Sequence, residues 1–458
     1  MTKDEPTQVD FYRDVLGSPK FVVAPMVDQS ELAWRMLSRR HGAHLCYTPM
    51  IHSSLFVKDP KYRKDAIQTC AEDRPLIVQF CGNDPQTLLE AGLIVQDLCD
   101  CAAVDINLGC PQAIARKGHY GAFLQDEWDL ISDIVNTLSK NLRIPVTCKI
   151  RIFEDIQKTI LYAQMLERSG CKLLTVHGRT REQKGPLTGL ADWRYVKTIR
   201  EHIKIPIFSN GNIQCLEDVT RCLEETGVQG IMTAEGNLYN PSVFESKIPL
   251  TWEICKEYLD LVELYPCPSS FIRGHLFKIL HHLLALPSND GFRSRTATAQ
   301  NIEDFRRVVN ELEAKYLPIH EGVVEYVQEL SSTDEPEKTF NISIPPWLCH
   351  SYIRIPPEEH KMKLEEAQKR AEDPNREKRL FYDEEGNQIS RKKMKKLRRL
   401  NRKPGRQGSQ NERSFDLCAE CTNPVGLKCS FSMCKRCCKS HCLEKDVKCI
   451  GHKLLKNE

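Results

Sequence analysis

The sequence predicts an α/β protein whose main part is a (β/α)8 TIM barrel, and three observations favour this fold class. Short apolar runs alternate with longer amphipathic stretches eight times between residues 20 and 245. Eight β/α units over about 225 residues fit a closed barrel better than an open doubly wound sheet. A Rossmann fold is the alternative, but no Gly-x-Gly-x-x-Gly pattern follows any of the apolar runs.

The expected strands are short apolar runs. They are residues 21–26, 44–50, 75–82, 103–110, 145–151, 173–179, 206–212 and 230–236. Amphipathic stretches such as residues 31–41, 85–98 and 159–170 lie between them and have helical periodicity, with Gly170 as an expected C-cap. We therefore expect residues 18–248 to form the barrel domain.

Three further units are expected after the barrel, because 458 residues exceed the size of one ordinary domain. Residues 249–330 contain apolar positions at helical spacing and no strand signal, which predicts a small helical domain. Residues 331–413 begin with proline-broken sequence and become strongly basic, as is typical of a linker. Residues 414–458 hold a cluster of cysteines and are expected to form a separate module.

Polar residues follow the expected strands one after another, at the ends where the catalytic groups of such barrels lie. They are Gln79, Asn107, Cys110, Lys149, Arg151, His177 and Arg179, followed by the segment "NGN" (Asn210, Gly211, Asn212) and the segment "AEG" (Ala234, Glu235, Gly236). Each one alone is weak evidence, but their succession favours a ligand site.

Lys149 is the most informative of these residues. Side chains alternate along a strand, so Lys149 and Arg151 share a face opposite Cys148. An unpaired ammonium group inside a barrel is unfavourable unless an anionic ligand lies beside it. The alternative is a salt bridge to a neighbouring carboxylate such as Asp105.

The loops after the seventh and eighth expected strands, "SNGN" and "TAEG", are small and contain glycine. Barrels commonly bind phosphate at these two loops. Flavin mononucleotide (FMN) would place its phosphate there and its ring near Pro25, Met26, Gln79 and Lys149.

Several segments resemble the signature segments of the tRNA dihydrouridine synthases. They are "APMV", "VQFCG", "DINLGCP", "CKIR", "HGRTREQKG" and "SNGNI", spread over roughly residues 18 to 325. The chain looks most like the eukaryotic branch that acts on D-loop uridines 16 and 17. The resemblance implies FMN-dependent reduction of uridine to 5,6-dihydrouridine in tRNA, with NADPH or NADH reducing the flavin.

The resemblance also implies roles for individual residues. Cys110 matches the proton donor, and Asn107 and Arg151 match neighbours of flavin or substrate, with Arg179 grouped among the substrate-binding candidates. Flavin-contacting positions are matched by Pro25, Met26, Val27, Gln79, Lys149, His177, Asn210, Gly211, Asn212, Ala234 and Glu235. One departure is that many bacterial relatives carry "GRG" where this chain has "AEG", which puts the role of Glu235 in doubt because a carboxylate repels phosphate.

The chemistry of uracil reduction accounts for a cysteine at this position. Hydride from reduced FMN adds to C6 of uracil, and a proton from Cys110 goes to C5. The donor must keep its proton until then, so we expect Cys110 not to be a thiolate of low pKa. The target base must leave its stack, and we expect a basic loop with Arg116, Lys117 and His119 to hold the neighbouring RNA backbone. A solvated surface loop is the alternative.

The cysteines divide into two sets, thirteen scattered over residues 46–349 and eight within residues 418–449. The second set, with two histidines, predicts two tetrahedral Zn²⁺ sites similar in spacing to small cross-braced RING-like fingers. The favoured ligands are Cys418, Cys421, Cys429, Cys434, Cys438, Cys442, Cys449 and His452. Cys437 and His441 are alternatives for two of them, and two short disulfides are the competing interpretation.

Residues 391–406 contain ten lysines and arginines in sixteen positions. This density favours binding to the tRNA phosphate backbone, and a nuclear localisation signal or a merely solvated segment would have the same composition. The polar, acidic first residues resemble no targeting sequence, and no apolar run is long enough to span a bilayer. We therefore expect a cytoplasmic or nuclear protein without membrane association; the sequence identifies no protein partner.

Two other functions remain open at this stage. A catalytically inactive barrel serving as an RNA- or protein-binding scaffold would need neither flavin nor Cys110. A barrel flavoprotein that acts on a free pyrimidine would need no affinity for RNA, and the basic segment disfavours it.

Overall fold

The computed structural model describes residues 10–327, 344–354, 356–372, 381–382, 388–390, 418–421, 425–426, 429–445 and 447–452. The chain divides into two compact units, Met1–Glu377 and Lys378–Glu458. Within the described residues, no helix has both the length and the apolar character needed to cross a membrane.

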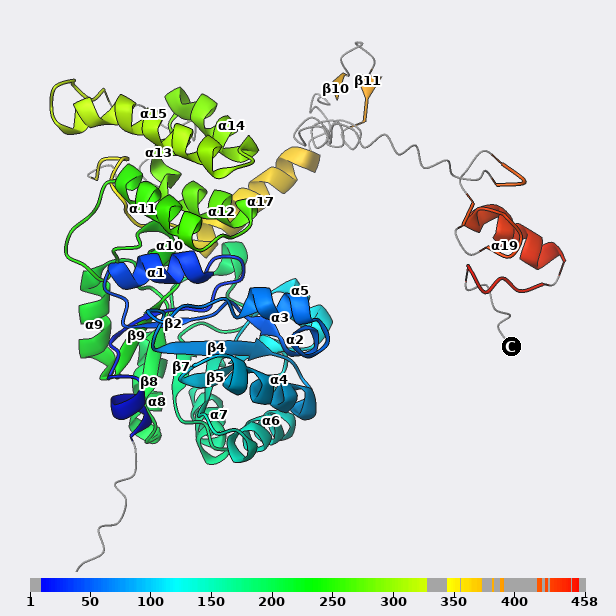
Figure 1. Cartoon of the computed structure of the whole chain (residues 1–458), viewed down its shortest axis with the longest axis horizontal. Coiled ribbons are helices and arrows are strands. Elements are labelled where there is room, and N and C mark those ends of the chain that lie inside the picture. Colours follow the sequence, from blue (N-terminus) through cyan, green and yellow to red (C-terminus); the bar gives the residue numbers. More distant parts are fainter. Residues whose placement is uncertain are drawn as a thin grey trace, which may run out of the picture. The chain divides into compact units, whose positions relative to one another are not determined.

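The first unit is built on a closed barrel of eight parallel strands (Figure 1). The strands are β1 (Phe21–Val23), β2 (Leu45–Tyr47), β4 (Leu76–Cys81), β5 (Ala103–Leu108), β6 (Val146–Arg151), β7 (Leu174–His177), β8 (Ile207–Asn210) and β9 (Gly230–Thr233). β1 pairs with β9, and β2 pairs with both β1 and β4, which closes the ring. The predicted barrel is confirmed, and each strand falls inside an expected segment. The sequence interpretation missed β3 (Ile51–His52), which pairs in parallel with the carboxyl end of β4.

Helices surround the strands. They are η1 (Phe11–Val15), α1 (Leu32–Arg40), α2 (Ser53–Lys58), α3 (Pro60–Ala66), α4 (Pro85–Leu98), α5 (Ala113–Gly118), η2 (Gly121–Phe123), α6 (Trp128–Asn141), α7 (Ile156–Arg168), η3 (Gly185–Leu187), α8 (Trp193–His202), α9 (Leu216–Thr226) and α10 (Glu235–Tyr239). Asp84 and Asp155 cap the first turns of α4 and α7 with their side chains. Gly170, expected to end α7, lies just after it with a left-handed φ of 104°.

The two faces of the barrel strands pack in two different apolar cores. The larger core fills the layer between strands and helices and includes Cys148 and Ile150, while the smaller one fills the barrel interior around Tyr47 and Phe208. The face of β6 opposite Cys148 and Ile150 is the one that carries Lys149 and Arg151, as the alternation predicts.

A helical subdomain follows the barrel and packs on α1. It comprises α11 (Thr251–Leu264), α12 (Ser269–Ile279), α13 (His281–Ala285), η4 (Pro287–Asn289), α14 (Asp290–Thr298) and α15 (Ile302–His320). Trp34 of α1 lies in the same core as Tyr258 of α11, and its ring stacks on His275 of α12 at 3.9 Å.

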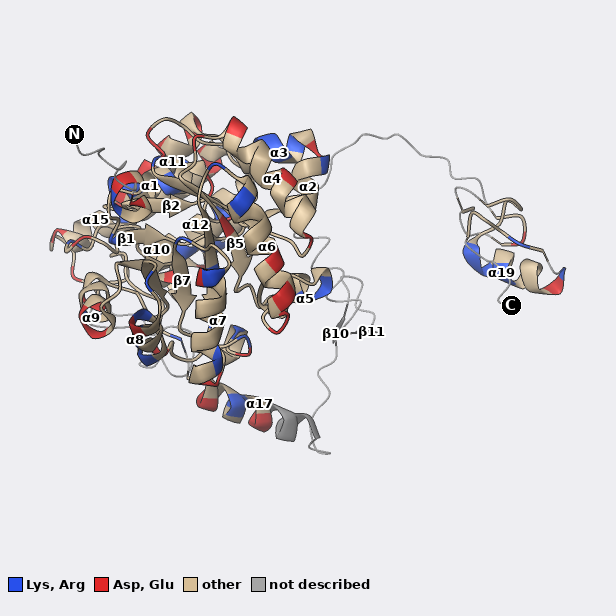
Figure 2. Cartoon of the chain, turned by 90° about the horizontal axis from the view of Figure 1, so that it is seen from below, with Lys and Arg blue, Asp and Glu red and all other residues tan. Residues whose placement is uncertain are grey.

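Residues 344–354, here named the return segment, lie within the stretch that the sequence suggested as a linker. Trp347 and Cys349 are buried in the core of the helical subdomain. The backbone N–H of Thr251 donates to the carbonyl of Trp347, and that of Cys349 donates to Pro249, both at 2.9 Å. After the return segment comes α17 (Pro357–Glu372), whose first part carries both acidic and basic residues (Figure 2).

The second unit contains a short antiparallel pair, β10 (Phe381–Tyr382) and β11 (Gln388–Ile389), and the helix α19 (Lys435–Glu444). The basic segment predicted at residues 391–406 lies outside the described residues.

Candidate active site

The predicted polar residues lie at the carboxyl ends of the barrel strands. Arg151 and the predicted residues that follow β7, β8 and β9 line a cavity of about 660 Å³, whereas Gln79, Asn107, Cys110 and Lys149 are not among its lining residues. The loops after β7, β8 and β9 and the return segment form its walls. Among its lining residues are Arg151, His177, Arg179, Asn210, Gly211, Asn212, Ala234, Glu235, Ile353 and Arg354.

A buried network of amide and carboxyl groups connects three strands beside this cavity. Gln79 on β4 donates to Asp105 Oδ2 on β5 at 2.8 Å, and Thr147 on β6 donates to Asp105 Oδ1 at 2.6 Å. Asn107 on β5 in turn donates to Gln79 Oε1 at 2.8 Å. Burial raises the pKa of Asp105 to about 6, and the hydrogen bonds from Thr147 and Gln79 partly oppose that rise. The network fixes the orientation of both amide side chains.

The turn that presents Cys110 is held by the side chains on either side of it. Asn107 Oδ1 accepts hydrogen bonds from the backbone N–H groups of Gly109 at 3.2 Å and Cys110 at 2.9 Å. Arg151 Nε donates to the carbonyl of Gly109 at 2.9 Å. Cys110 is thereby fixed to β5 through Asn107 and to β6 through Arg151.

Cys110 lies half-buried beside an apolar cluster that contains Cys81, Ala115 and Tyr120. Its carbonyl accepts a hydrogen bond from the N–H of Ala122 at 3.1 Å. Gly121 has a left-handed φ of 66°, and a Cβ there would lie 2.8 Å from the Cys110 carbonyl oxygen. Only glycine therefore fits this approach of the two backbones.

Lys149 points into the same region and contacts an amide. Its Nζ donates to Asn210 Oδ1 on β8 at 2.8 Å. Burial and then the charge of Arg151 lower the pKa of Lys149 to about 7. Among the described residues Lys149 forms no salt bridge, so the alternative contact with Asp105 is not formed, since Asp105 accepts from Gln79 and Thr147 instead.

His177 and Arg179 connect β7 with the loop after β8. Burial, followed by the charges of Arg151, Lys149 and Arg179, holds the pKa of His177 well below its usual range. The ring is therefore neutral, and its Nε2 lies 3.1 Å from Arg179 Nη1, which donates to it. Arg179 Nη2 also donates to Asn212 Oδ1 at 2.8 Å and to the carbonyl of Gly189 at 2.9 Å.

Arg151 is equally engaged with the backbone. Its Nη1 donates to the carbonyls of Thr180 at 2.8 Å and Gln183 at 3.1 Å. Arg151 therefore joins the cysteine turn to the loop after β7. The positions of Arg151 and Arg179 suit residues that shape the cavity, and their predicted contacts with substrate remain predictions.

The loop after β1 carries Pro25, Met26 and Val27. Met26 packs against both the barrel core and the helical core, and its backbone is bonded to Ser30 Oγ at 3.0 Å. Val27 is 57% exposed, which leaves its side chain free for a ligand contact.

The sequence interpretation missed Arg354, which comes from the return segment. Arg354 Nε donates to Glu235 Oε2 at 3.0 Å, and its Nη2 donates to the other carboxylate oxygen. The only local signal was the presence of Trp347 and Cys349, apolar residues in a stretch that otherwise reads as a polar linker.

The expected basic loop is wrong in one respect, because residues 113–118 form the helix α5. Alanine, isoleucine, arginine and lysine propagate a helix between Pro111 and His119, whose left-handed φ of 53° ends it. Arg116 and Lys117 are exposed on α5 (Figure 2). The guanidinium of Arg116 lies 5.7 Å from the centre of the Phe123 ring.

Lys184 Nζ and the Arg181 guanidinium also lie near the Phe123 ring, at 5.5 and 5.9 Å. His119 is paired with Glu127 at 2.8 Å instead of being available to an anion.

The residues at the barrel mouth fit a flavin. Lys149 is a partly buried ammonium group that donates to an amide oxygen, so a hydrogen-bond acceptor on a ring ligand would complete its surroundings. The amides of Gln79 and Asn107 lie on the neighbouring strands and are fixed in place. Arg179 and Arg354 line the part of the cavity that borders the loops after β8 and β9, where barrels bind phosphate.

The second unit brings two groups of metal-ligating side chains together. One consists of Cys418, Cys421, Cys434 and Cys437, and the other of Cys429, Cys438, Cys449 and His452. In each group all four ligand atoms lie within 4.8 Å of one another, so both groups could hold a metal ion. The two sets alternate along the chain, as expected for a cross-braced module.

Seven of the eight favoured ligands belong to these groups, and Cys437 stands in place of Cys442. The reason is the register of α19. Cys434 is its N-cap and accepts from the N–H of Cys437, which brings these two thiols together in one turn. Cys442 lies one turn after Cys438, with the two sulfurs 3.9 Å apart, and is outside both groups.

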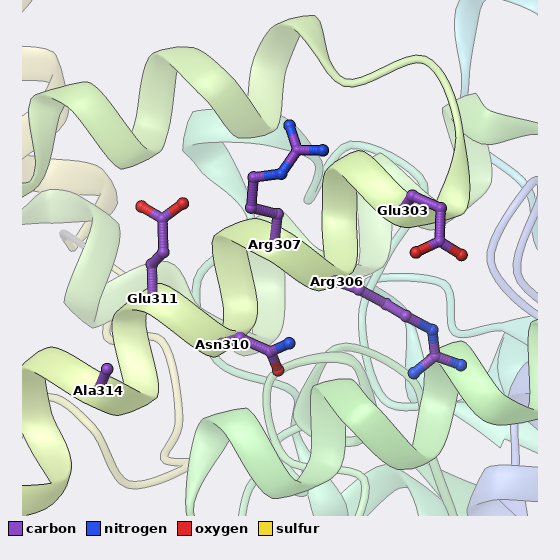
Figure 3. A pocket seen from close by; sticks show the side chains of 6 residues that line it. All are labelled: Glu303, Arg306, Arg307, Asn310, Glu311 and Ala314. Carbon is purple, nitrogen blue, oxygen red and sulfur yellow. The ribbon is translucent and has the colours of Figure 1, made fainter.

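A further cavity of about 370 Å³ lies on the surface of α15 (Figure 3). Its charged side chains are engaged with partners on the protein surface: Arg306 pairs with Asp260 at 2.7 Å and Glu311 with Arg295 at 2.7 Å. It lacks the buried, incompletely paired groups found at the barrel mouth and is not a comparable candidate.

The comparisons with known proteins agree with this geometry. The family described as "Dihydrouridine synthase (Dus)" matches residues 22–321. A mouse protein named tRNA-dihydrouridine(16/17) synthase [NAD(P)(+)]-like is 47% identical over 97% of this chain and 90% of its own length. The Saccharomyces cerevisiae tRNA-dihydrouridine(16/17) synthase [NAD(P)(+)] is 45% identical over 74% of this chain and 85% of its own length. A human tRNA-dihydrouridine(20a/20b) synthase [NAD(P)+]-like is 35% identical over 62% of this chain and 88% of its own length.

Proposed function

This chain belongs to the dihydrouridine synthase family, and from that premise we propose that it reduces uridines 16 and 17 in the D-loop of tRNA. The product is 5,6-dihydrouridine, and NADPH or NADH is the reductant. The relatives that match most of the chain carry the 16/17 name, which supports these target positions.

The observation that carries the proposal is the fixed position of the Cys110 turn near Lys149, a partly buried ammonium group that donates to an amide oxygen. Asn107 and Arg151 hold the cysteine turn from two sides, so the thiol has a defined position at the mouth of the barrel. A proton donor must be positioned to act as general acid, because proton transfer depends on distance and direction.

FMN, when bound, supplies the hydride that goes to C6 of the uracil ring. Cys110 then gives its proton to C5, on the face of the base opposite the hydride. Lys149, Gln79 and Asn107 hold the flavin ring, and the loops after β8 and β9 hold its phosphate. The neutral ring of His177 and the side chains of Arg151 and Arg179 shape the cavity between these parts.

The tRNA approaches across α5 and the loop after β7. Arg116, Lys117, Arg181 and Lys184 supply positive charge beside the cavity, and Phe123 offers a ring face among them. These groups suit an RNA backbone held while one base turns out of its stack into the mouth of the barrel.

We further propose that the two ligand groups of the second unit each bind one Zn²⁺, since cysteine and histidine in sets of four suit a tetrahedral ion. Residues 391–406 add a sequence-independent grip on tRNA or direct the protein to the nucleus. The cytoplasm and nucleus, where thiols stay reduced, suit a chain with twenty-one cysteines.

The experiment that tests the function is mass spectrometry of tRNA from cells that lack this protein. Dihydrouridine is expected to disappear from positions 16 and 17 and to return with the wild-type chain. Cys110→Ala is the matched variant and should not restore it. A purified protein that binds no flavin, together with unchanged dihydrouridine at both positions, would overturn the proposal in favour of the scaffold function.

A further inference from the structure

The return segment is fixed to two parts of the first unit and ends at the cavity of the barrel. Besides its contacts with the helical subdomain, Ser351 Oγ donates to the carbonyl of Gln214 at 2.9 Å. Gln214 Nε2 donates back to the carbonyl of Tyr352 at 3.3 Å, and the Tyr352 ring stacks on Tyr239 at 5.5 Å. Arg354 therefore reaches the cavity from a well-anchored backbone.

Arg354 differs from the other cations that line this cavity. Arg151 and Arg179 donate mainly to backbone carbonyls of neighbouring loops, and Lys184 donates to the carbonyl of Pro111 at 2.9 Å. Arg221 pairs with Asp218 at 2.8 Å on α9. Arg354 is paired with Glu235, a carboxylate that belongs to the loop after β9.

The charge of Glu235 is otherwise difficult to reconcile with a phosphate at that loop. A carboxylate beside a phosphate is unfavourable, and the pair with Arg354 cancels its charge. A guanidinium group has five N–H donors, so the two donors directed at Glu235 leave others for a second anion. Arg354 thus lies within reach of the place where a barrel binds phosphate, between Glu235 and the loop after β8.

We propose that Arg354 binds the phosphate of FMN and thereby distinguishes FMN from riboflavin. The inference rests on the proposed function, since it takes the cavity to be the flavin site. In this chain the segment after the eighth barrel strand is "AEG" and has no arginine. The inference is that Arg354, from outside the barrel, supplies the positive charge instead.

The test compares FMN with riboflavin, which differ only in the phosphate. The full-length protein, freed of flavin, is titrated with each, and binding is followed by quenching of flavin fluorescence. Arg354→Gln should weaken FMN binding by roughly tenfold or more, because a charge-assisted hydrogen bond to phosphate is lost, and should leave riboflavin binding unchanged within about twofold. Arg354→Lys, which keeps the charge, should recover part of the FMN affinity.

The chain offers a matched control on the helical subdomain. Arg295 is paired bidentately with Glu311, and its side chain is 45% exposed against 43% for Arg354. Arg295→Gln should leave the affinities for FMN and for riboflavin unchanged.

Glu235→Gln separates phosphate binding from anchoring of the return segment. Both Arg354→Gln and Glu235→Gln break the pair, but the latter also removes the repelling charge, so FMN should bind as tightly or more tightly. Equal weakening of FMN and riboflavin in both variants would mean that the pair only anchors the segment, and the inference would be wrong.

Three other outcomes overturn the inference. Unchanged FMN affinity in Arg354→Gln with weakened tRNA binding would assign Arg354 to an RNA phosphate. A wild-type protein that binds FMN and riboflavin equally well refutes the role of Arg354 but leaves the proposed function intact, whereas one that binds neither refutes both.

Discussion

The barrel mouth and the cysteine module both depend on cysteine, but they use its sulfur in opposite ways. In the first unit Cys110 is a single thiol that two side chains hold in a turn, and the nearest cysteine of its cluster, Cys81, is buried with its pKa raised to about 12. In the second unit thiols gather in sets, such as Cys421 and Cys434 with sulfurs 3.7 Å apart.

The difference shows that the number of nearby thiols determines which chemistry is available. One isolated thiol can give up a proton but cannot enclose a metal ion, whereas four converging ligands hold an ion and leave no position open for substrate. Most of the remaining cysteines of the barrel, such as Cys222, are buried. Burial raises the pKa of Cys222 to about 11. Three environments therefore give the same residue three roles.

The sharpest test of this comparison is Cys110→Ala. Dihydrouridine formation should fall by about 10²-fold or more, since general acid catalysis contributes on that order. Flavin binding and zinc content should not change. Cys222→Ala is the control, because it removes a buried thiol of the same domain and should leave the turnover rate unchanged. If Cys110→Ala kept activity within a few-fold of the wild type, Cys110 would have no role in the reaction that Cys222 lacks.

Substitutions in the cysteine module of the second unit should change the amount of bound metal and should not change the reaction at the barrel. Cys437→Ser is expected to reduce bound zinc from two ions to one per chain, as measured by metal analysis of the full-length protein, because Cys437 belongs to the first ligand group. Cys442→Ser should keep both ions and is the matched control from the same helix. The opposite result would return Cys442 to the ligand set that the sequence suggested. Neither variant should alter flavin binding.

Lys149 provides a test at the barrel mouth, because its charge depends on pH. Its pKa in the flavin-free mouth is about 7, and a flavin acceptor beside it would raise that pKa. Binding then takes up a proton, so FMN affinity should be greatest below pH 7 and fall by up to about tenfold per pH unit as pH rises toward the pKa of the complex. Lys149→Met should bind FMN more weakly near pH 7 and lose this slope. A wild-type affinity independent of pH between 7 and 9 would contradict the assigned role.

The smallest expected effect comes from the backbone behind Cys110. Gly121→Ala should lower the turnover rate by about tenfold, equivalent to roughly 1.4 kcal/mol, because the added Cβ would push on the Cys110 carbonyl. Gly227→Ala has the same φ of 66° but no heavy atom within 4 Å of its Cβ, so it tests backbone strain alone. Thermal melting should show a loss of stability in both that is larger in Gly121→Ala, because of the added contact, and only Gly121→Ala should have a lower turnover rate. Equal rates would mean that the turn tolerates displacement of Cys110.

Most of the fold and half of the site follow from the sequence for a simple physical reason. Parallel strands are buried on both faces and appear as apolar runs, so all eight barrel strands lie inside the expected segments. Alternation along a strand places Lys149 and Arg151 on one face without knowledge of any contact.

What could not be predicted depends on contacts between distant parts of the chain or on helix register. Arg354 lies 119 positions after Glu235, and nothing near it in the sequence indicates that partner. Cys437 and Cys442 are equivalent by spacing until the start of α19 is known. Glycines on both sides of Arg116 suggested a loop, although the residues between them favour a helix. The protonated state expected of Cys110 stays a prediction.

The return segment has a consequence for the order in which the protein matures during synthesis. Chains leave the ribosome from the N-terminus, and domains generally fold as units in that order. The barrel strands and helices α11 to α15 are complete at His320, before Ile353 and Arg354 have been synthesised. One wall of the cavity is therefore among the last parts of the first unit to emerge. A chain interrupted between these points would have every strand of its barrel but would lack this wall of the cavity.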